Sequence, residues 1–207
     1  MKKFFSSLAM AALVTVAAAS SATAGLIQEI DTTLGAWKAA GLQTIGDKTF
    51  TFGSSAGIDD GDGVKFIELS DNTYLFNVVD LGNNAMGTIA LDYSVTVNQV
   101  GYSIDQVGLN ADIQDGGAGT NVTKNYTDEH GATYQLAITP VSGRQTLNVP
   151  SVHQLHVSIT TAGDGTLFSI SDSYHQSPVP EPSTFALLGL GGLGFAVRAI
   201  RRRKVAA

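Results

Sequence analysis

Short runs of residues with high strand propensity recur along most of this chain, and they limit its possible folds more than any other feature. Runs rich in Thr, Val, Ile, Tyr and Phe follow one another about every 8 to 13 residues, with clusters of Gly, Asn and Asp between them. We expect strands at residues 48–52, 64–69, 73–79, 88–97, 105–113, 120–126, 132–139, 144–149, 152–160 and 166–171.

Several of these runs alternate between apolar and polar residues. Leu91, Tyr93 and Val95 point to one face of such a strand, while Asp92 and Ser94 point to the other. Because each alternating strand has one face to bury, two sheets packed face to face are the expected solution. The sequence therefore predicts an all-β fold, a β-sandwich of the jelly-roll or immunoglobulin-like kind.

One short helix is expected before the first of these strands. Ile27, Ile30, Leu34 and Trp37 recur at helical spacing, and Gly41 is suited to end the helix. We expect this helix to lie across the sandwich.

The first 24 residues have the three-part pattern of a secretory signal peptide. Two lysines precede an alanine-rich apolar stretch (4–19), and small residues follow at Ala22 and Ala24. The apolar stretch is short and is interrupted by serine and threonine, which disfavours a permanent membrane anchor. We expect export through the Sec translocon and cleavage after Ala24, so that the mature chain begins at Gly25.

A second membrane signal is predicted at the other end of the sequence. Residues 183–200 are mostly apolar, and a basic cluster follows at Arg201, Arg202, Arg203 and Lys204. A helix of about 18 residues spans about 27 Å, close to the roughly 30 Å hydrocarbon core of a bilayer. Basic residues on one side of a span are retained in the cytoplasm, so the basic cluster acts as a stop-transfer signal. We expect a helix in the inner membrane with the preceding domain outside.

Pro180, Glu181 and Pro182 stand directly before this span, and Ser183 is its first residue. Two prolines cannot lie inside a helix, so an extended break is expected here. The Pro-Glu-Pro triplet, the glycine-rich apolar span and the basic tail together resemble the PEP-CTERM sorting signal. That resemblance implies recognition and cleavage by an exosortase, in bacteria with a Gram-negative envelope that make extracellular polysaccharide.

The predicted organisation is therefore a signal peptide (1–24), a secreted domain (25–176) and a sorting signal (177–207). Between Gly25 and Pro180 the chain has 17 acidic and 5 basic residues, a net charge of −12. Nucleic acids and anionic lipids require a basic surface, so neither is an expected partner. The sequence has no cysteine, and the exported domain must fold without disulfides.

Enzyme motifs are not found. The histidines stand at His130, His153, His156 and His175. His153 and His156 are three residues apart and face opposite sides of a strand, so they cannot ligate one metal ion together. We expect His153 at the edge of the core with Leu155, and His156 on the polar face. No His-Glu-x-x-His pair occurs, and the sequence does not predict an enzyme.

The acidic loop at Asp59, Asp60 and Asp62 is the best candidate metal site. Its closely spaced carboxylates and two glycines suit Ca²⁺, which prefers oxygen ligands. The spacing does not fit an EF-hand, because Lys65 occupies the position of the required glycine. Aspartate and glycine are also typical of ordinary turns, so a turn and a calcium site both remain open.

Two functions of different classes fit the exported domain. A structural or adhesive protein of a biofilm matrix needs only solubility, an anchor and a stable fold, and we prefer this hypothesis. A secreted carbohydrate- or calcium-binding module is the alternative, and extracellular polysaccharide is the expected partner for carbohydrate binding. Carbohydrate binding requires exposed aromatic side chains, for which the candidates are Trp37, Tyr102, Tyr126 and Tyr174, although packing in or beside the core is expected for each.

Overall fold

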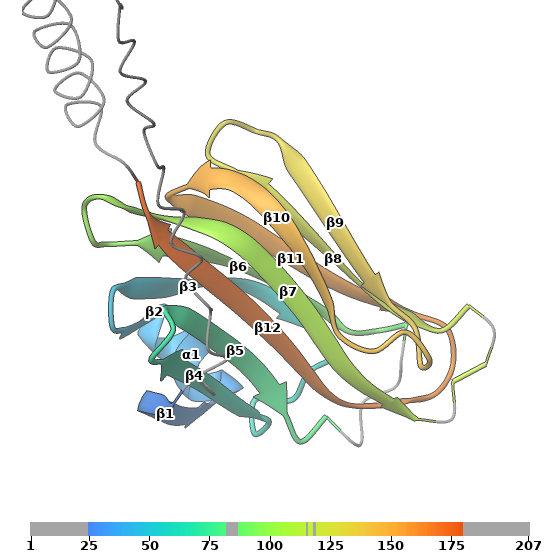
Figure 1. Cartoon of the computed structure of the whole chain (residues 1–207). Helices are drawn as coiled ribbons and strands as arrows, with labels where there is room; N and C mark the ends of the chain where they lie inside the picture. The colour runs from blue at the N-terminus through green and yellow to red at the C-terminus, as the bar shows by residue number, and fades with distance from the viewer. Residues whose placement is uncertain (1–24, 82–86, 115, 118, 180–207) are drawn as a thin grey trace, which may run out of the picture.

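The computed structural model describes residues 25–81, 87–114, 116–117 and 119–179, and there the chain forms two antiparallel sheets and one helix (Figure 1). Sheet A contains, in spatial order, β1 (Leu26–Thr33), β4 (Gly63–Leu69), β5 (Thr73–Val79), β12 (Thr166–Pro178), β7 (Tyr102–Gln114) and β10 (Gln145–Val152). Sheet B contains β2 (Leu42–Ile45), β3 (Lys48–Ala56), β6 (Ala90–Val97), β11 (Gln154–Ala162), β8 (Asn121–Asp128) and β9 (Thr133–Ile138). The predicted all-β sandwich is confirmed.

The alternation seen in the sequence determines which side chains fill the space between the sheets. In β6, Leu91, Tyr93 and Val95 are buried, while Asp92 and Ser94 between them stay partly exposed. A shift of register by one residue would turn all these apolar side chains to the solvent, so the pattern fixes the register of the strand. The same alternation recurs in β5, β8 and β11.

Aromatic rings fill one half of the core. The Trp37 ring lies 5.2 to 5.4 Å, between centroids, from the rings of Phe52, Phe66 and Phe76, and the Phe76 and Tyr93 rings are 4.6 Å apart. These separations are typical of aromatic pairs, which contribute about 0.5–1.5 kcal/mol each beyond the burial of their area. Both sheets supply rings, so this cluster joins one sheet to the other.

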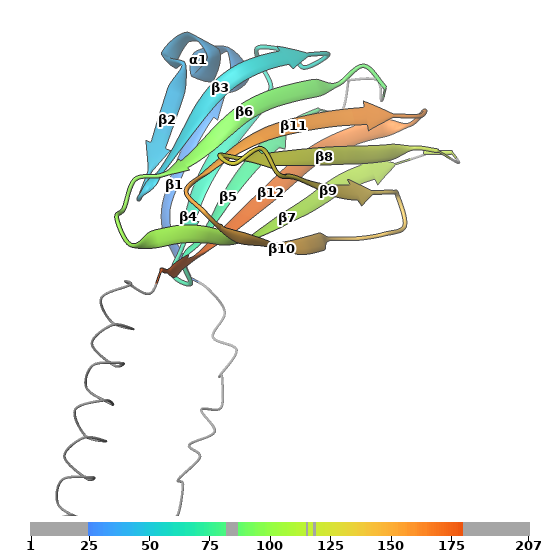
Figure 2. The ribbon, with the colours of Figure 1, turned by 90° about the horizontal axis from the view of Figure 1, so that it is seen from above.

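The helix α1 (Leu34–Ala40) connects β1 of sheet A to β2 of sheet B, and Figure 2 shows it at the edge of the sandwich. Thr33 caps its start by accepting a hydrogen bond from the Ala36 amide at 3.3 Å. Gly41 ends it in the left-handed conformation, with φ of 74°, as predicted. The buried Trp37 and Leu34 side chains make this helix a cover over the edge of the core.

The expected start of the helix was wrong. Ile27 and Ile30 belong to β1, which pairs with β4 in an antiparallel register that runs from Leu26 opposite Leu69 to Thr33 opposite Gly63. The three-residue spacing of two isoleucines did not exclude a strand, and pairing with a distant strand decided the outcome. β2 was also missing from the prediction.

The last strand is longer than predicted. β12 pairs with β7 from Thr166 opposite Gln114 to Pro178 opposite Tyr102, and the register shifts twice along the way. β12 ends at Pro178, two residues after the expected end of the secreted domain at residue 176.

Candidate functional site

The outer face of sheet A has a polar groove where three neighbouring strands meet. Asp105 and Gln106 of β7, Asn148 of β10 and His175 of β12 line a cavity of about 560 Å³. The sheet register explains their meeting, because Gln106 lies opposite Asn148 on one side and opposite His175 on the other. These strands are far apart in sequence but adjacent in sheet A (Figure 1).

Two side-chain contacts hold the groove together. His175 Nδ1 lies 2.8 Å from Asp105 Oδ1, and Gln106 Nε2 donates to Asn148 Oδ1 at 3.0 Å. Partial burial raises the pKa of Asp105, but hydrogen bonds from His175 and Ser177 outweigh this effect and keep the pKa below its ordinary value. The groove therefore presents an ionised carboxylate, two amides and an imidazole, a set of groups that can donate and accept hydrogen bonds.

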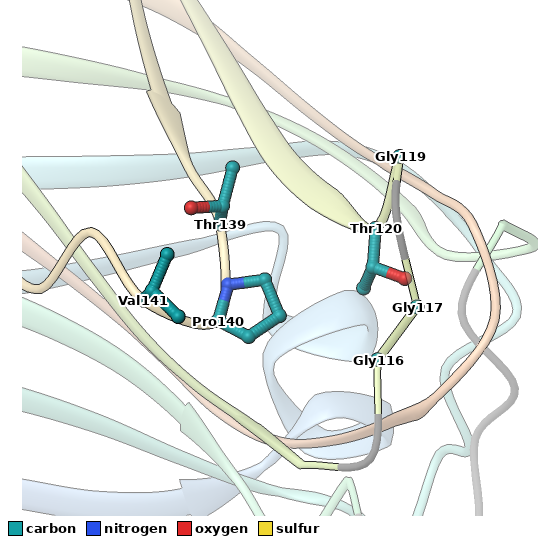
Figure 3. Close-up of a pocket in the computed structure, with 7 residues that line it drawn as sticks. All are labelled: Gly116, Gly117, Gly119, Thr120, Thr139, Pro140 and Val141. Atoms are coloured by element: carbon teal, nitrogen blue, oxygen red, sulfur yellow. The ribbon is translucent and has the colours of Figure 1, made fainter.

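A second hollow is lined by glycines and short side chains (Figure 3). Its volume is about 360 Å³, and it lies between the segments that follow β7 and β9. Figure 3 shows Thr139, Pro140 and Val141 on one side and Thr120 with the glycines on the other; the glycines are Gly116, Gly117 and Gly119. Among the described residues that line it, none is acidic, basic or a thiol. The described lining of this hollow therefore offers no group for acid–base chemistry.

A buried cluster of charged and hydroxyl groups lies between the two sheets. Lys124 of β8 and Asp172 of β12 both have no exposed surface, and Lys124 Nζ lies 2.6 Å from Asp172 Oδ1. Lys124 Nζ also donates to the hydroxyls of Tyr93 and Tyr174, at 3.2 and 3.0 Å. The Tyr126 ring covers the ammonium group with its centroid 4.6 Å away. The polar and aromatic contacts of this ammonium group are thus with a carboxylate, hydroxyls and aromatic faces.

A second buried lysine lies in the aromatic half of the core. Lys48 Nζ is 2.6 Å from Asp47 Oδ1, donates to Gln176 Oε1, and lies 4.3 Å from the centroid of the Tyr74 ring. Burial lowers the pKa of Lys48, and its hydrogen bond with Asp47 opposes that shift. In its polar contacts, Lys48 differs from Lys124 because its carboxylate partner is the adjacent residue in the chain.

The predicted acidic loop has a structural role. The carbonyl oxygens of Asp60 and Asp62 accept hydrogen bonds from the amides of Gly35 and Leu34, both at 2.9 Å, at the start of α1. Asp62 Oδ2 accepts from the Asp59 amide at 3.0 Å, and the Asp60 carboxylate pairs with Lys38 at 2.5 Å. Within the described ranges, no group of three or more metal-binding side chains is found. Calcium binding at the three aspartates stays a prediction.

Positions were predicted for two of the four histidines, and one of these predictions is confirmed. His156 is exposed and its neighbours Leu155 and Val157 are buried, as predicted. The expectation for His153 was wrong, because its side chain is 57% exposed. The chain bends at His153 between β10 and β11, so this residue does not continue the alternation of the strand. The structure brings His175, which the sequence did not single out, into the polar groove.

The aromatic residues considered for sugar stacking are mostly in the core. Trp37 is 1% exposed, and Tyr126 and Tyr174 have no exposed surface. Tyr102 is half-buried and packs against the core. Trp37, Tyr126 and Tyr174 therefore cannot stack on a ligand from the solvent, and they pack in the core as expected.

The sequence-predicted sorting and cleavage residues lie almost entirely outside the described residues. Ala22, Ala24, Pro180, Glu181, Pro182, Ser183, Arg201, Arg202, Arg203 and Lys204 all fall in this category, as does the predicted membrane helix. Among the residues that are described, no helix has the length and apolar character needed to cross a bilayer.

The two ends of the described domain meet at one turn. The turn between β4 and β5 holds Gly25, because the Ser70 amide donates to the Gly25 carbonyl at 2.8 Å. The same turn holds the last strand, because the Gln176 amide donates to the Asn72 carbonyl at 3.2 Å. Both ends of the sandwich therefore leave it on the same side.

The solved structures that match this chain do so at low identity and low TM-score. No curated protein matches the chain. Among solved structures, TmCBM27, a carbohydrate-binding module studied for mannan recognition, is 9% identical, with 76% of this chain and 100% of its own covered and a TM-score of 0.35. The family 32 module of C. perfringens NanJ, solved with galactose, is 14% identical, with 70% and 100% covered and a TM-score of 0.30. At this identity and TM-score, the similarity assigns no ligand to the chain.

A family model identifies the end of the chain. The model described as the PEP-CTERM protein-sorting motif matches residues 178–203. The match begins at Pro178, the last residue of β12, and confirms the resemblance found in the sequence. The chain therefore carries a PEP-CTERM protein-sorting motif that starts where its β-sandwich ends.

Proposed function

We propose that this chain is an exported cell-surface or extracellular matrix protein, processed by an exosortase, with a structural or adhesive role in a biofilm or exopolysaccharide layer. The observation that carries the proposal is the PEP-CTERM motif at residues 178–203. This motif implies an exported protein that is anchored in the membrane before an exosortase processes it. The meeting of both domain ends at the β4–β5 turn supports the proposal, because it directs the rest of the domain away from the membrane.

The composition of the domain supports a structural role. Its net charge of −12 between Gly25 and Pro180 favours solubility in an external matrix and disfavours nucleic-acid binding. A role of this kind needs a stable scaffold and no catalytic group. We therefore propose a function that is not enzymatic.

The termini of the exported protein test this proposal. Mass spectrometry of protein recovered from the cell surface or medium is expected to find Gly25 at the start of the chain. It is also expected to find no peptide that contains Arg201 to Lys204, because these residues follow the cleaved segment. Exported molecules that retain Met1 would contradict the predicted signal peptide.

Carbohydrate binding is a second candidate, and the polar groove on sheet A is the observation that favours it. Two amides, a carboxylate and an imidazole converge at Asp105, Gln106, Asn148 and His175. Sugar hydroxyls both donate and accept hydrogen bonds, so this mixture of groups matches them. The groove differs from the aromatic site expected from the sequence, because all four of its lining residues are polar.

A glycan array probed with the wild-type protein and two single variants tests the groove. We expect Asn148→Ala to weaken binding about tenfold, since one lost hydrogen bond is worth about 1 kcal/mol or slightly more. Gln135→Ala is a matched control, because Gln135 also donates to an asparagine, Asn125, at 2.9 Å, but in sheet B. If wild type binds no glycan, or if both variants weaken binding equally, the groove is not a carbohydrate site.

A further inference from the structure

Lys124 and Asp172 form a close, buried pair between the two sheets. The amine and the carboxylate come from opposite sheets and meet in the core, with 2.6 Å between Nζ and Oδ1. Neither side chain has any exposed surface. Reacting groups held near van der Waals contact in fixed orientation behave as if they were at very high concentration, of about 10⁵ M or more.

The surroundings shift both groups toward their neutral forms. Burial disfavours charge, so it lowers the pKa of Lys124 to about 8, against the opposing effect of Asp172. Burial likewise raises the pKa of Asp172, although its contacts with Lys124 and Tyr93 oppose this shift. A neutral amine is a nucleophile, and a neutral carboxylic acid can lose its hydroxyl as water.

Two tyrosines complete a path for the proton. Lys124 Nζ donates to the Tyr174 hydroxyl at 3.0 Å, the Tyr174 and Tyr93 hydroxyls are 2.5 Å apart, and the Tyr93 hydroxyl donates to Asp172 Oδ2. Because Tyr93 gives its only proton to Asp172, Tyr174 must be the donor between the two tyrosines. The hydrogen bonds thus run in one direction, from the amine to the oxygen of the carboxyl group that has to leave.

We propose that Lys124 and Asp172 become joined by an amide bond between Nζ and Cγ, which ties β8 to β12. The neutral amine attacks Cγ of the protonated carboxyl group, and the C–Oδ2 bond breaks. One proton from Nζ passes through Tyr174 and Tyr93 to the departing oxygen, which leaves as water. One amine and one acid give one amide and one water, so the reaction needs no oxidant, cofactor or other reactant.

The proposed amide bond would hold β12 against a mechanical pull. β12 is the strand that leads directly into the sorting motif, so any pull from the membrane side acts first on this strand. An amide to Lys124 connects β12 to sheet B through a covalent bond. The sequence contains no cysteine, so a disulfide cannot do this.

Peptide mapping of the full chain, purified from expressing cells, denatured and digested with trypsin, tests the proposal. Trypsin does not cut after a lysine whose amine is an amide, so peptide 125–144 is expected to be absent. Residues 66–144 are instead expected in one product, joined to the peptide that begins at Gln145. The mass of that product is expected to be lower than the sum of the two peptides by one water molecule.

Lys48 is the matched control in the same digest, because it is also fully buried, but its carboxylate partner Asp47 is the adjacent residue in the chain and has a side chain that is 12% exposed. Peptide 49–65 is therefore expected in full yield, which shows that burial alone did not protect a lysine. Asp172→Ala is expected to restore peptide 125–144, whether or not the variant folds. If wild type gives peptide 125–144 in the same yield as peptide 49–65, the proposal is wrong. An uncut peptide 66–144 at its unmodified mass would also overturn it.

Discussion

Replacing Asp172 by alanine is expected to lower the free energy of unfolding by about 3–5 kcal/mol, the usual cost of removing one partner of a buried ion pair. The reason is that Lys124 has no exposed surface and lies 2.6 Å from the carboxylate, so the variant leaves a buried amine without its acid. Loss of the proposed amide bond adds to this effect. Urea denaturation followed by circular dichroism measures the change.

Two controls separate the causes of this loss. Asp60→Ala removes the partner of Lys38, but the Asp60 side chain is 71% exposed, so a loss of only about 0–1 kcal/mol is expected. The double variant Lys124→Met with Asp172→Leu removes both charges and keeps the volume, so it is expected to regain much of the stability. An Asp172→Ala variant as stable as Asp60→Ala would mean that the pair contributes nothing to the fold.

The sequence predicted the strands well because each strand carries its own signal. Leu91, Tyr93 and Val95 alternate with polar residues, and that pattern alone indicates one buried face. The start of the helix was harder to predict. The spacing of Ile27 and Ile30 along the sequence fits a helix, but it also occurs in a strand, and here the segment pairs with β4. Pairing with the distant strand β4 makes residues 26–33 a strand, and no local sequence pattern contains that information.

The buried lysines were missed although the sequence contains their signal. Lys124 lies on the same face of its strand as the buried Val122 and Tyr126. Asp172 likewise lies on the same face as the buried Ile170 and Tyr174. A charged residue at an inward position has to find a partner inside the core. Two such residues of opposite sign on different strands therefore pointed to a pair, but only the fold shows that they meet.

The polar groove could not be found from the sequence. Gln106, Asn148 and His175 are polar residues on the outer faces of three strands, where polar residues are normal. Their meeting depends on the order of β12, β7 and β10 in sheet A and on the register between these strands. Neither the strand order nor the register follows from the local alternation of any one strand.

Replacing Pro180, Glu181 and Pro182 by alanines is expected to abolish processing almost completely. Prolines fix the backbone and prevent a helix, whereas three alanines allow the predicted membrane helix at residues 183–200 to extend toward the domain. The segment that an exosortase is expected to recognise then loses its extended form. The apolar span and the basic tail are unchanged, so insertion into the membrane is expected to survive.

Deleting Arg201 to Lys204 is the companion variant, because it acts on a different step. The four basic residues are expected to hold the tail in the cytoplasm, so their loss weakens the stop-transfer signal. More unprocessed chain is expected in the periplasm. The two variants thus separate recognition of the motif from retention in the membrane.

Cell fractionation followed by immunoblotting against the β-sandwich is the most direct test of the sorting function. For wild type, a shortened protein is expected in the surface or extracellular fraction. For the triple-alanine variant, full-length precursor is expected in the membrane fraction, with almost no released protein. If the triple-alanine variant is shortened and released as efficiently as wild type, the motif at residues 178–203 does not direct the processing of this protein.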